Sequence, residues 1–347
     1  MASQARPQAT GAIHEFDLIR KVSRRHGAGS PSILRGIGDD AAAIAPPKRR
    51  HQLFTTDLLA EGVHFDRLTA QWPDIGFRAA AANLSDIAAM GGTPEYLLVA
   101  LAIPRHGTVK QVQQLYEGIM AACKPYKVRL IGGDTSASAG KWFIGITLIG
   151  SVQPGRTLYR SGARIGDALY VTGTIGDSLA GLKLLQRSRP VPSGKSLQPR
   201  HREFLMRRHL RPTARIAEGQ WLSTHKWATS AIDLSDGLSG DLRHICEESH
   251  VGAEIQLAAL PLSPACRTYA TATRQNPTAL ALAGGEDYEL LFTVPSRLRR
   301  RFERSALSRP TRITRIGTIL PAKAGVVAIL PNGKRQPLKI TSYEHFR

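Results

Sequence analysis

AAAANLSDIAAMGG, residues 79–92, is the stretch that decides the expected fold. Alanine favours helix because it loses no side-chain entropy, and the two closing glycines predict where the helix ends. One acidic side chain, Asp86, lies near that end. Because an isolated buried carboxylate is costly, we expect Asp86 to be paired with another group or bound to a metal ion.

On both sides of this helix, short apolar segments alternate with helix-forming segments. The pattern predicts helices at 15–26 and 109–123, strands at 52–56, 96–103, 129–131, 142–150, 168–172 and 290–294, a turn at 132–136 and a surface loop at 188–198. Such alternation predicts an α/β (α+β) protein. A turn-rich segment around residue 153 predicts a boundary between an N-terminal domain, 1–153, and a C-terminal domain, 154–347.

Composition sets the class of protein. With 347 residues, 42% of them hydrophobic, the chain is long enough for two domains with cores of their own. No apolar run approaches the roughly 20 residues that span a bilayer, and the N-terminal residues show no signal-peptide pattern. The three cysteines, Cys123, Cys246 and Cys266, lie far apart, which predicts a reducing compartment and favours the cytoplasm.

The net charge of +20, from 47 Lys and Arg against 27 Asp and Glu, permits two interpretations. One is a polyanionic partner such as nucleic acid, and the other is an arginine-rich surface on an enzyme that handles phosphates. Basic residues cluster at 200–202, 207–208 and 297–304. Because these clusters have little aromatic interleaving and match no nucleic-acid module, we favour the second interpretation.

Aspartates recur in glycine-rich turns and at the predicted ends of strands: Asp39, Asp40, Asp57, Asp86, Asp134, Asp233 and Asp236. Hydroxyl side chains accompany several of them, including Thr55, Thr56 and Ser235. Mg²⁺ prefers such oxygen ligands and usually binds through one or two carboxylates, water and substrate phosphates. A single aspartate of this kind more often caps a turn, but the set together predicts a metal-dependent phosphate enzyme.

Four further residues each permit a functional and a structural interpretation. Arg160 could reach a phosphate or be a surface residue, and His64 could contact a ligand or fill a turn. Glu286 lies in the segment GGEDYE, residues 284–289, before a predicted strand. Tyr343, near the C-terminus, could reach a site only if the tail folds back.

These motifs resemble one known family. The resembling segments are GIGDDAA from Gly36, TTDLLAEGVHF from Thr55, NLSDIAAMGGTPEY from Asn83, LIGGDTS from Leu130, RSGARIGDALYVTGTIGDS from Arg160, AIDLSDGLSGDL from Ala231 and AGGEDYELLFTVP from Ala283. In this order the chain resembles the thiamine-monophosphate kinases, whose superfamily includes aminoimidazole ribonucleotide synthetase and selenophosphate synthetase. Each segment alone is weak, whereas the ordered set is specific.

The resemblance implies transfer of the γ-phosphoryl group of ATP to thiamine monophosphate, the last step of thiamine diphosphate biosynthesis, with several Mg²⁺ ions. The implied metal-site residues are Asp40, Thr55, Thr56, Asp57, Asp86, Asp134, Asp233 and Asp236. The implied nucleotide-site residues are Gly133, Asp134, Arg160, Ser235 and Tyr116, and the implied substrate-site residues are His64, Glu286 and Tyr343. It also implies a synthetase-like fold, in which the sheet of the N-terminal domain pairs with a second copy to form a dimer barrel, followed by a C-terminal α/β domain.

The sequence departs from the family pattern at a long basic insertion, residues 187–203, and in its net charge, neither of which touches a motif. Two alternative functions follow from the sequence. One is a different ATP-dependent synthetase of the superfamily; selenophosphate synthetase fits poorly, because Cys123 lies inside a predicted helix and not in an N-terminal glycine loop. The other is a basic protein that binds nucleic acid on a kinase-like scaffold.

Overall fold

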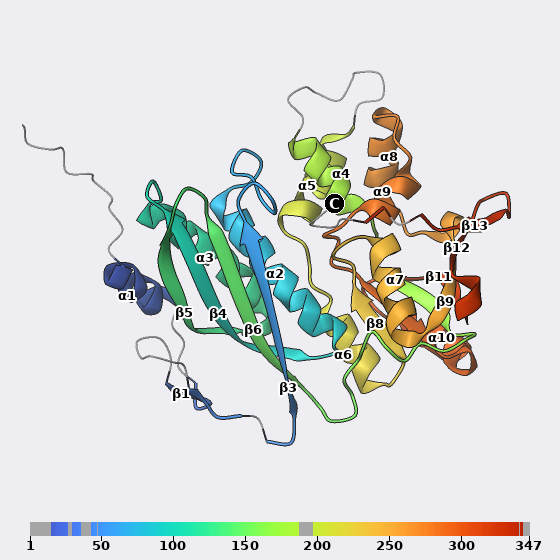
Figure 1. Ribbon diagram of the computed structural model, residues 1–347, viewed down its shortest axis with the longest axis horizontal. Helices are drawn as coiled ribbons and strands as arrows, with labels where there is room; N and C mark the ends of the chain where they lie inside the picture. Colours follow the sequence, from blue (N-terminus) through green and yellow to red (C-terminus); the bar gives the residue numbers. More distant parts are fainter. Residues whose placement is uncertain are drawn as a thin grey trace, which may run out of the picture. The chain divides into compact units, whose positions relative to one another are not determined.

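A computed structural model describes residues 15–26, 30–35, 43–46, 48–186, 197–339 and 341–342. Helices and strands are mixed throughout (Figure 1), which confirms the predicted α/β class. The strands form a two-stranded ribbon of β1 (Ile33–Arg35) and β2 (Ala43–Ile44), a four-stranded sheet and a seven-stranded sheet. Within the described ranges, no helix combines the length and apolar character that a membrane crossing requires.

The four-stranded sheet comes from the first half of the chain. Its strands, in spatial order, are β3 (His51–Ala60), β6 (Phe143–Val152), β4 (Thr93–Pro104) and β5 (Arg129–Ser138). Its helices are α1 (Glu15–His26), α2 (Trp72–Ala89) and α3 (Val109–Cys123), of which α2 and α3 lie along one face of the sheet (Figure 1). The predicted helices 15–26 and 109–123 are confirmed.

Close packing of α2 on α3 depends on two glycines. A Cβ atom at Gly118 would lie 1.9 Å from the carbonyl oxygen of Pro73, and one at Gly76 would lie 2.0 Å from that of Leu115. Both distances are far below van der Waals contact, so any larger residue would push the helices apart. Helix α2 begins at Trp72, well before the alanine run where the sequence predicted its start, and the contacts of Pro73 and Gly76 with α3 lie in this added length.

The seven-stranded sheet comes from the second half of the chain and has the spatial order β13-β12-β9-β11-β7-β10-β8. Its strands are β7 (Ala168–Thr172), β8 (Ser230–Asp233), β9 (Val251–Gln256), β10 (Leu290–Val294), β11 (Ile313–Pro321), β12 (Val326–Ile329) and β13 (Arg335–Pro337). The accompanying helices are α4 (Asp177–Leu185), α5 (Pro199–Leu210), α6 (Ile216–Thr224), α7 (Leu238–Ser249), α8 (Pro264–Ala272), α9 (Pro277–Ala283) and α10 (Arg299–Ala306). The predicted strands 168–172 and 290–294 are confirmed. Most of the loop predicted at 188–198 lies outside the described residues.

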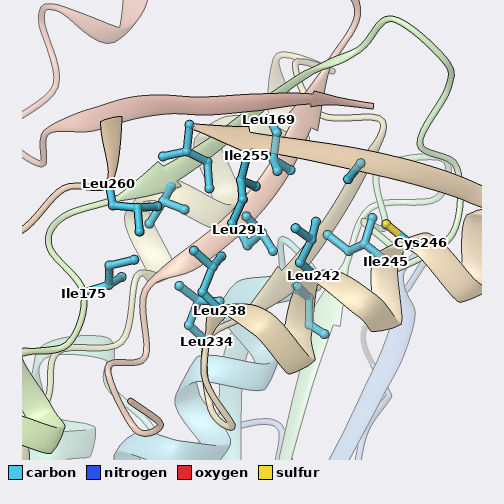
Figure 2. Packing of buried hydrophobic residues seen from close by; sticks show 14 of the residues in the cluster. Leu169, Ile175, Leu234, Leu238, Leu242, Ile245, Cys246, Ile255, Leu260 and Leu291 are labelled. Atoms are coloured by element: carbon cyan, nitrogen blue, oxygen red, sulfur yellow. The ribbon is translucent and has the colours of Figure 1, made fainter. Parts of the chain in front are cut away.

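Helix α7 packs its apolar side against this sheet. Leu238 and Leu242 of the helix share a buried cluster with Ile255 of β9 and Leu291 of β10 (Figure 2). Leu234, which directly follows Asp233, belongs to the same cluster and is 1% exposed. Burial of large apolar side chains contributes about 1.5–3 kcal/mol each, so this core fixes the loop between β8 and α7.

The chain divides into two compact units. The first comprises residues 1–46, 56–80 and 96–147, and the second comprises 47–55, 81–95 and 148–347. The second unit therefore contains the seven-stranded sheet together with the start of β3, the C-terminal half of α2 and the start of β4.

Candidate functional site

The C-terminal half of α2 is held firmly within the second unit. A Cβ atom at Gly219 of α6 would lie 2.0 Å from the carbonyl oxygen of Ala88, so α6 approaches the end of α2 closely. The N–H of Leu158 donates to the carbonyl oxygen of Met90 at 3.2 Å. The helix end that carries Asp86 is thus tied to two other segments, which limits the movement of that carboxylate.

Asp86 itself is partly buried between a hydroxyl and a positive charge. The hydroxyl of Thr55, on β3, donates to Oδ2 of Asp86. Burial raises the pKa of Asp86, while the hydrogen bond from Thr55 and the charge of Arg160 lower it. Burial disfavours the negative charge of Asp86, and Thr55 and Arg160 offset this cost only in part. A bound cation would offset it further. The expectation that this carboxylate has partners is confirmed.

A second group of carboxylates lies where β8 leads into α7. Asp233 is 3% exposed and ends β8, and Asp236 follows in the loop. Asp241, on the first turn of α7, accepts the backbone N–H of Gly237 at 3.0 Å. Burial raises the pKa of Asp241 well above its ordinary value, and the negative charges of Asp233 and Asp236 raise it further. Three aspartates therefore share one region of negative charge.

Asp241 was not among the residues predicted from the sequence. The sequence could have indicated Asp241, because the segment DLSDGLSGD, residues 233–241, has a third aspartate at its end, where the turn leads into a helix. Its side chain accepts the backbone N–H groups of Gly237 and, at 3.3 Å, Asp236. Asp241 thus shapes the loop that presents Asp236.

The segment GGEDYE, residues 284–289, runs beside this loop. The N–H of Glu286 donates to the carbonyl oxygen of Ser235 at 2.8 Å, and the N–H of Tyr288 donates to that of Leu234 at 2.9 Å. A Cβ atom at Gly285 would lie 2.5 Å from the carbonyl oxygen of Ser235, so a side chain there would prevent this approach. The fold therefore brings the predicted residues Glu286, Ser235 and Asp236 together from motifs that are far apart in the sequence.

Gly133 and Asp134 lie in the first unit, inside β5. The prediction of a turn at 132–136 is wrong, because parallel pairing with β4 continues through this segment and matches Gly133 to Val99 and Asp134 to Ala100. A Cβ atom at Gly133 would lie 1.9 Å from the carbonyl oxygen of Val99, so only glycine permits this pairing. Both residues are exposed, which leaves the Asp134 carboxylate open to ligands.

Thr55, Thr56 and Asp57 lie in the middle of β3, not at its end. The strand continues to Ala60, since Leu59 alternates inward like Leu53 and extends the buried face. The predicted strand end at residue 56 is therefore wrong. The Thr56 hydroxyl lies 3.1 Å from that of Thr147 on β6.

The remaining predicted residues differ in how well the fold exposes them. His64 is half-buried, and its Nδ1 accepts the N–H of Ala60 at 3.0 Å, as expected of a turn histidine. Tyr116 is 6% exposed, its ring stacks on His26 at 6.0 Å between centroids, and burial raises its pKa. Asp40 and Tyr343 lie outside the described residues.

The predicted metal site can be tested against the donors that are present. Among the described residues, no three His, Cys, Asp or Glu side chains gather closely enough to hold a metal ion by themselves. The donors are instead hard oxygens in separate groups, at Asp86 with Thr55 and at Asp233 with Asp236. Mg²⁺ commonly binds through one or two carboxylates and completes its shell with water and substrate phosphates. This donor set fits a magnesium ion that arrives with a nucleotide.

Beside Glu286, Asp287 is a buried carboxyl group whose titration affects stability. It accepts the backbone N–H groups of Gly176 at 2.5 Å and Ser178 at 3.0 Å, and it is 1% exposed. Burial raises the pKa of Asp287 to about 7, although the positive charge of Arg208 and the two N–H groups act in the opposite direction. The folded chain therefore keeps a proton here over a pH range in which the unfolded chain loses it.

Between pH 5 and pH 7, we expect Asp287 to lower the stability of the folded chain as the pH rises. Above an unfolded pKa of about 3.9 the folded state binds more protons, so the free energy of unfolding falls by up to about 1.4 kcal/mol per pH unit. Urea unfolding of the wild type and of Asp287→Asn at both pH values measures the effect. The difference in unfolding free energy between the two proteins should change by about 2–3 kcal/mol across this window, and parallel curves would contradict the assignment.

Comparisons with known proteins agree with this arrangement. The family described as AIR synthase related protein matches through its N-terminal domain over residues 38–152 and its C-terminal domain over residues 164–329. Thiamine-monophosphate kinase from Haemophilus influenzae is 38% identical over 341 residues, which cover 97% of this chain and 99% of the relative.

Two solved structures are similar over most of their length. Thiamine-monophosphate kinase from Stenotrophomonas maltophilia K279a has a TM-score of 0.78 and 35% identity, and the match covers 92% of this chain and 95% of that one. AaThiL, solved in complex with AMPPCP and TMP, has a TM-score of 0.75 and 35% identity, with 99% of this chain and 100% of that one covered.

Proposed function

The chain belongs to the thiamine-monophosphate kinase family, and from this membership we propose that it converts thiamine monophosphate to thiamine diphosphate with ATP. A phosphate oxygen of the acceptor attacks the γ-phosphorus of ATP, the bond from that phosphorus to the β-phosphate bridging oxygen breaks, and ADP leaves. The observation that carries this proposal is the presence of Asp86, Asp233 and Asp236 in the family's motifs, each held in a defined setting by the fold.

We assign three roles to the site residues. The residues that would hold Mg²⁺ are Asp86, Asp233 and Asp236, together with Asp40, Thr55, Thr56, Asp57 and Asp134. The nucleotide contacts Gly133, Asp134, Arg160, Ser235 and Tyr116, and thiamine monophosphate contacts His64, Glu286 and Tyr343. Support comes from the Thr55–Asp86 hydrogen bond, from the pairing of Glu286 with Ser235 and from the AMPPCP and TMP bound to AaThiL.

No general base is needed in this reaction. The acceptor phosphate is already anionic near neutral pH, so catalysis consists mainly of positioning and of neutralising charge. Mg²⁺, when bound, screens the repulsion between the two phosphate groups. Arg160, which lies within electrostatic range of Asp86, supplies a further positive charge.

Release of ADP in a coupled assay tests the proposed reaction. We expect thiamine monophosphate to stimulate ADP release by at least about 100-fold over ATP alone, and we expect EDTA to remove the stimulation. Thiamine without a phosphate group is the matched control, because it lacks the anionic acceptor and should give no stimulation. ADP release that is indifferent to thiamine monophosphate would overturn the proposal.

We further propose a cytoplasmic homodimer whose partners are the two small substrates rather than nucleic acid. Phe54 and Leu58, four residues apart on β3, are 65% and 59% exposed, and Phe143 on β6 is 36% exposed. Exposed apolar side chains on neighbouring strands favour burial against a second copy. Light scattering of the purified protein, measured as it elutes from a size-exclusion column, should give a mass twice that of one chain.

The proposed domain boundary remains near residue 153. The family's N-terminal domain matches up to residue 152 and its C-terminal domain from residue 164, which supports this position. The N-terminal domain would then comprise 1–153 and the C-terminal domain 154–347.

A further inference from the structure

A cavity of about 490 Å³ lies in the second unit, away from the residues assigned above. Its walls come from β7, from α10, from the segment that joins α10 to β11 and from the start of β11. Volumes of about 300–1,000 Å³ are typical of small-molecule sites. None of the lining residues belongs to the proposed kinase site, so this cavity needs its own explanation.

Positive charge dominates the cavity. Arg309, Arg312 and Arg315 line it, and Glu303 is the one acidic residue among its lining residues. The Glu303 carboxylate already accepts the hydroxyl of Tyr170 at 2.8 Å. In the part of the chain that the structure describes, none of the three arginines has an acidic side chain within 4.0 Å. Three guanidinium groups therefore share one cavity with a single carboxylate, which leaves a net charge of +2.

The three arginines are held in place through their neighbours. The carbonyl oxygen of Arg312 accepts the N–H of Gly173 at 2.7 Å. Arg315 pairs with Tyr170 across the β7–β11 register, at an irregularity in β11 that begins there. The guanidinium of Arg309 lies 5.3 Å from the centre of the Trp221 ring, a cation–π contact that orients it. The backbones of Arg312 and Arg315 and the guanidinium of Arg309 are thus fixed by their neighbours.

One of the three arginines, Arg315, acts on the hydroxyl of Tyr170, which lines the cavity. Burial raises the pKa of Tyr170, and the hydrogen bond and charge of Glu303 raise it further. The charge of Arg315 lowers it, and that of Arg299 does so as well. Arg315 therefore acts on the same hydroxyl that Glu303 accepts, at the wall of the cavity.

Apolar side chains with exposed surface make up part of the remaining wall, namely Ala306, Leu307 and Ile313, whereas Phe302 beneath them is fully buried. Aromatic or aliphatic parts of a ligand can pack there, while arginine recognises phosphate through its planar set of N–H donors. We propose that this cavity binds a small organic phosphate with at least two negative charges, whose apolar part lies against Ala306 and Leu307 and whose phosphate meets the three arginines. This site is separate from the proposed kinase reaction and requires neither ATP nor Mg²⁺.

Phenyl phosphate is a suitable probe, because it combines an apolar ring with a dianionic phosphate. Calorimetric titration of the full chain in EDTA, without nucleotide, should show binding to the wild type. In Arg312→Glu/Arg315→Glu we expect the dissociation constant to rise by at least about tenfold. Arg297→Glu/Arg300→Glu is the matched control, since it changes the charge equally at two exposed positions that do not line the cavity, and it should change the constant by less than about threefold.

Inorganic phosphate lacks the phenyl ring, so its affinity measures the ionic contribution to binding alone. It should bind more weakly than phenyl phosphate. Arg312→Gln, which removes the charge but keeps a polar side chain, should weaken binding in the same direction with the unfolding curve unchanged. Equal losses in both double variants would overturn the proposal, since they would indicate a diffuse field. So would undetectable binding of phenyl phosphate up to about 10 mM. A single-stranded oligonucleotide that binds, when phenyl phosphate does not, would assign the charge to nucleic acid instead.

Discussion

Asp86→Asn should lower turnover at saturating ATP and thiamine monophosphate by at least about 100-fold, because an amide cannot replace a carboxylate as a ligand and charge partner for Mg²⁺. Asn retains one oxygen that can accept the hydroxyl of Thr55. Burial raises the pKa of Asp86, so removing its charge relieves a desolvation cost. We therefore expect the variant to be as stable as the wild type, with the loss confined to catalysis.

Asp74→Asn is the matched control for this experiment. It makes the same chemical change in the same helix, but in the first turn of α2, where a carboxylate contributes only about 0.3–1 kcal/mol through the helix dipole. Its turnover should remain within about twofold of the wild type. If Asp86→Asn retains wild-type turnover, or if Asp74→Asn loses turnover to the same extent, the role assigned to Asp86 is wrong.

Glu289→Gln should destabilise the fold by about 3–5 kcal/mol, the cost of breaking a buried ion pair on one side. Glu289 is 0% exposed. Arg215 donates to both carboxylate oxygens, from Nη2 at 2.5 Å and from Nε at 2.6 Å, and Arg208 donates from Nη2 at 2.9 Å. Glutamine keeps the shape of the side chain but leaves two guanidinium groups without the charge that they share.

Urea unfolding of the wild type and of Glu289→Gln measures this loss. Glu247→Gln is the matched control, because Glu247 forms an exposed pair with Arg243 at 3.4 Å on α7. Exposed pairs of this spacing contribute about 0.3–0.5 kcal/mol, so the control should scarcely move the unfolding midpoint. Similar midpoints for the two variants would show that the buried network does not stabilise the fold.

Local patterns predicted much of the fold. The helix 109–123 and the strand 168–172 have the predicted bounds, because helix propensity and a short apolar run act within a few residues. Asp86, Asp233 and Asp236 were singled out in the same local way, from the hydroxyl and glycine residues that accompany them in short motifs.

The features that the sequence could not predict depend on contacts between segments that are far apart in the chain. The turn expected at 132–136 is strand because β4 pairs along the whole of it, and Gly133 permits the approach. The contact of Arg208 and Arg215 with Glu289 joins residues more than 70 positions apart, which no local pattern indicates. The charged cavity likewise depends on how β11 pairs with β7, because this pairing places Arg315 opposite Tyr170 at the cavity wall.

The fate of the γ-phosphoryl group tests the central claim most directly. The purified full chain is incubated with Mg²⁺, thiamine monophosphate and ATP that carries a radioactive γ-phosphoryl group, and the products are separated by chromatography. We predict that the label appears in thiamine diphosphate in amounts equal to the ADP formed. Label found only in inorganic phosphate, or in any product other than thiamine diphosphate, would contradict the account.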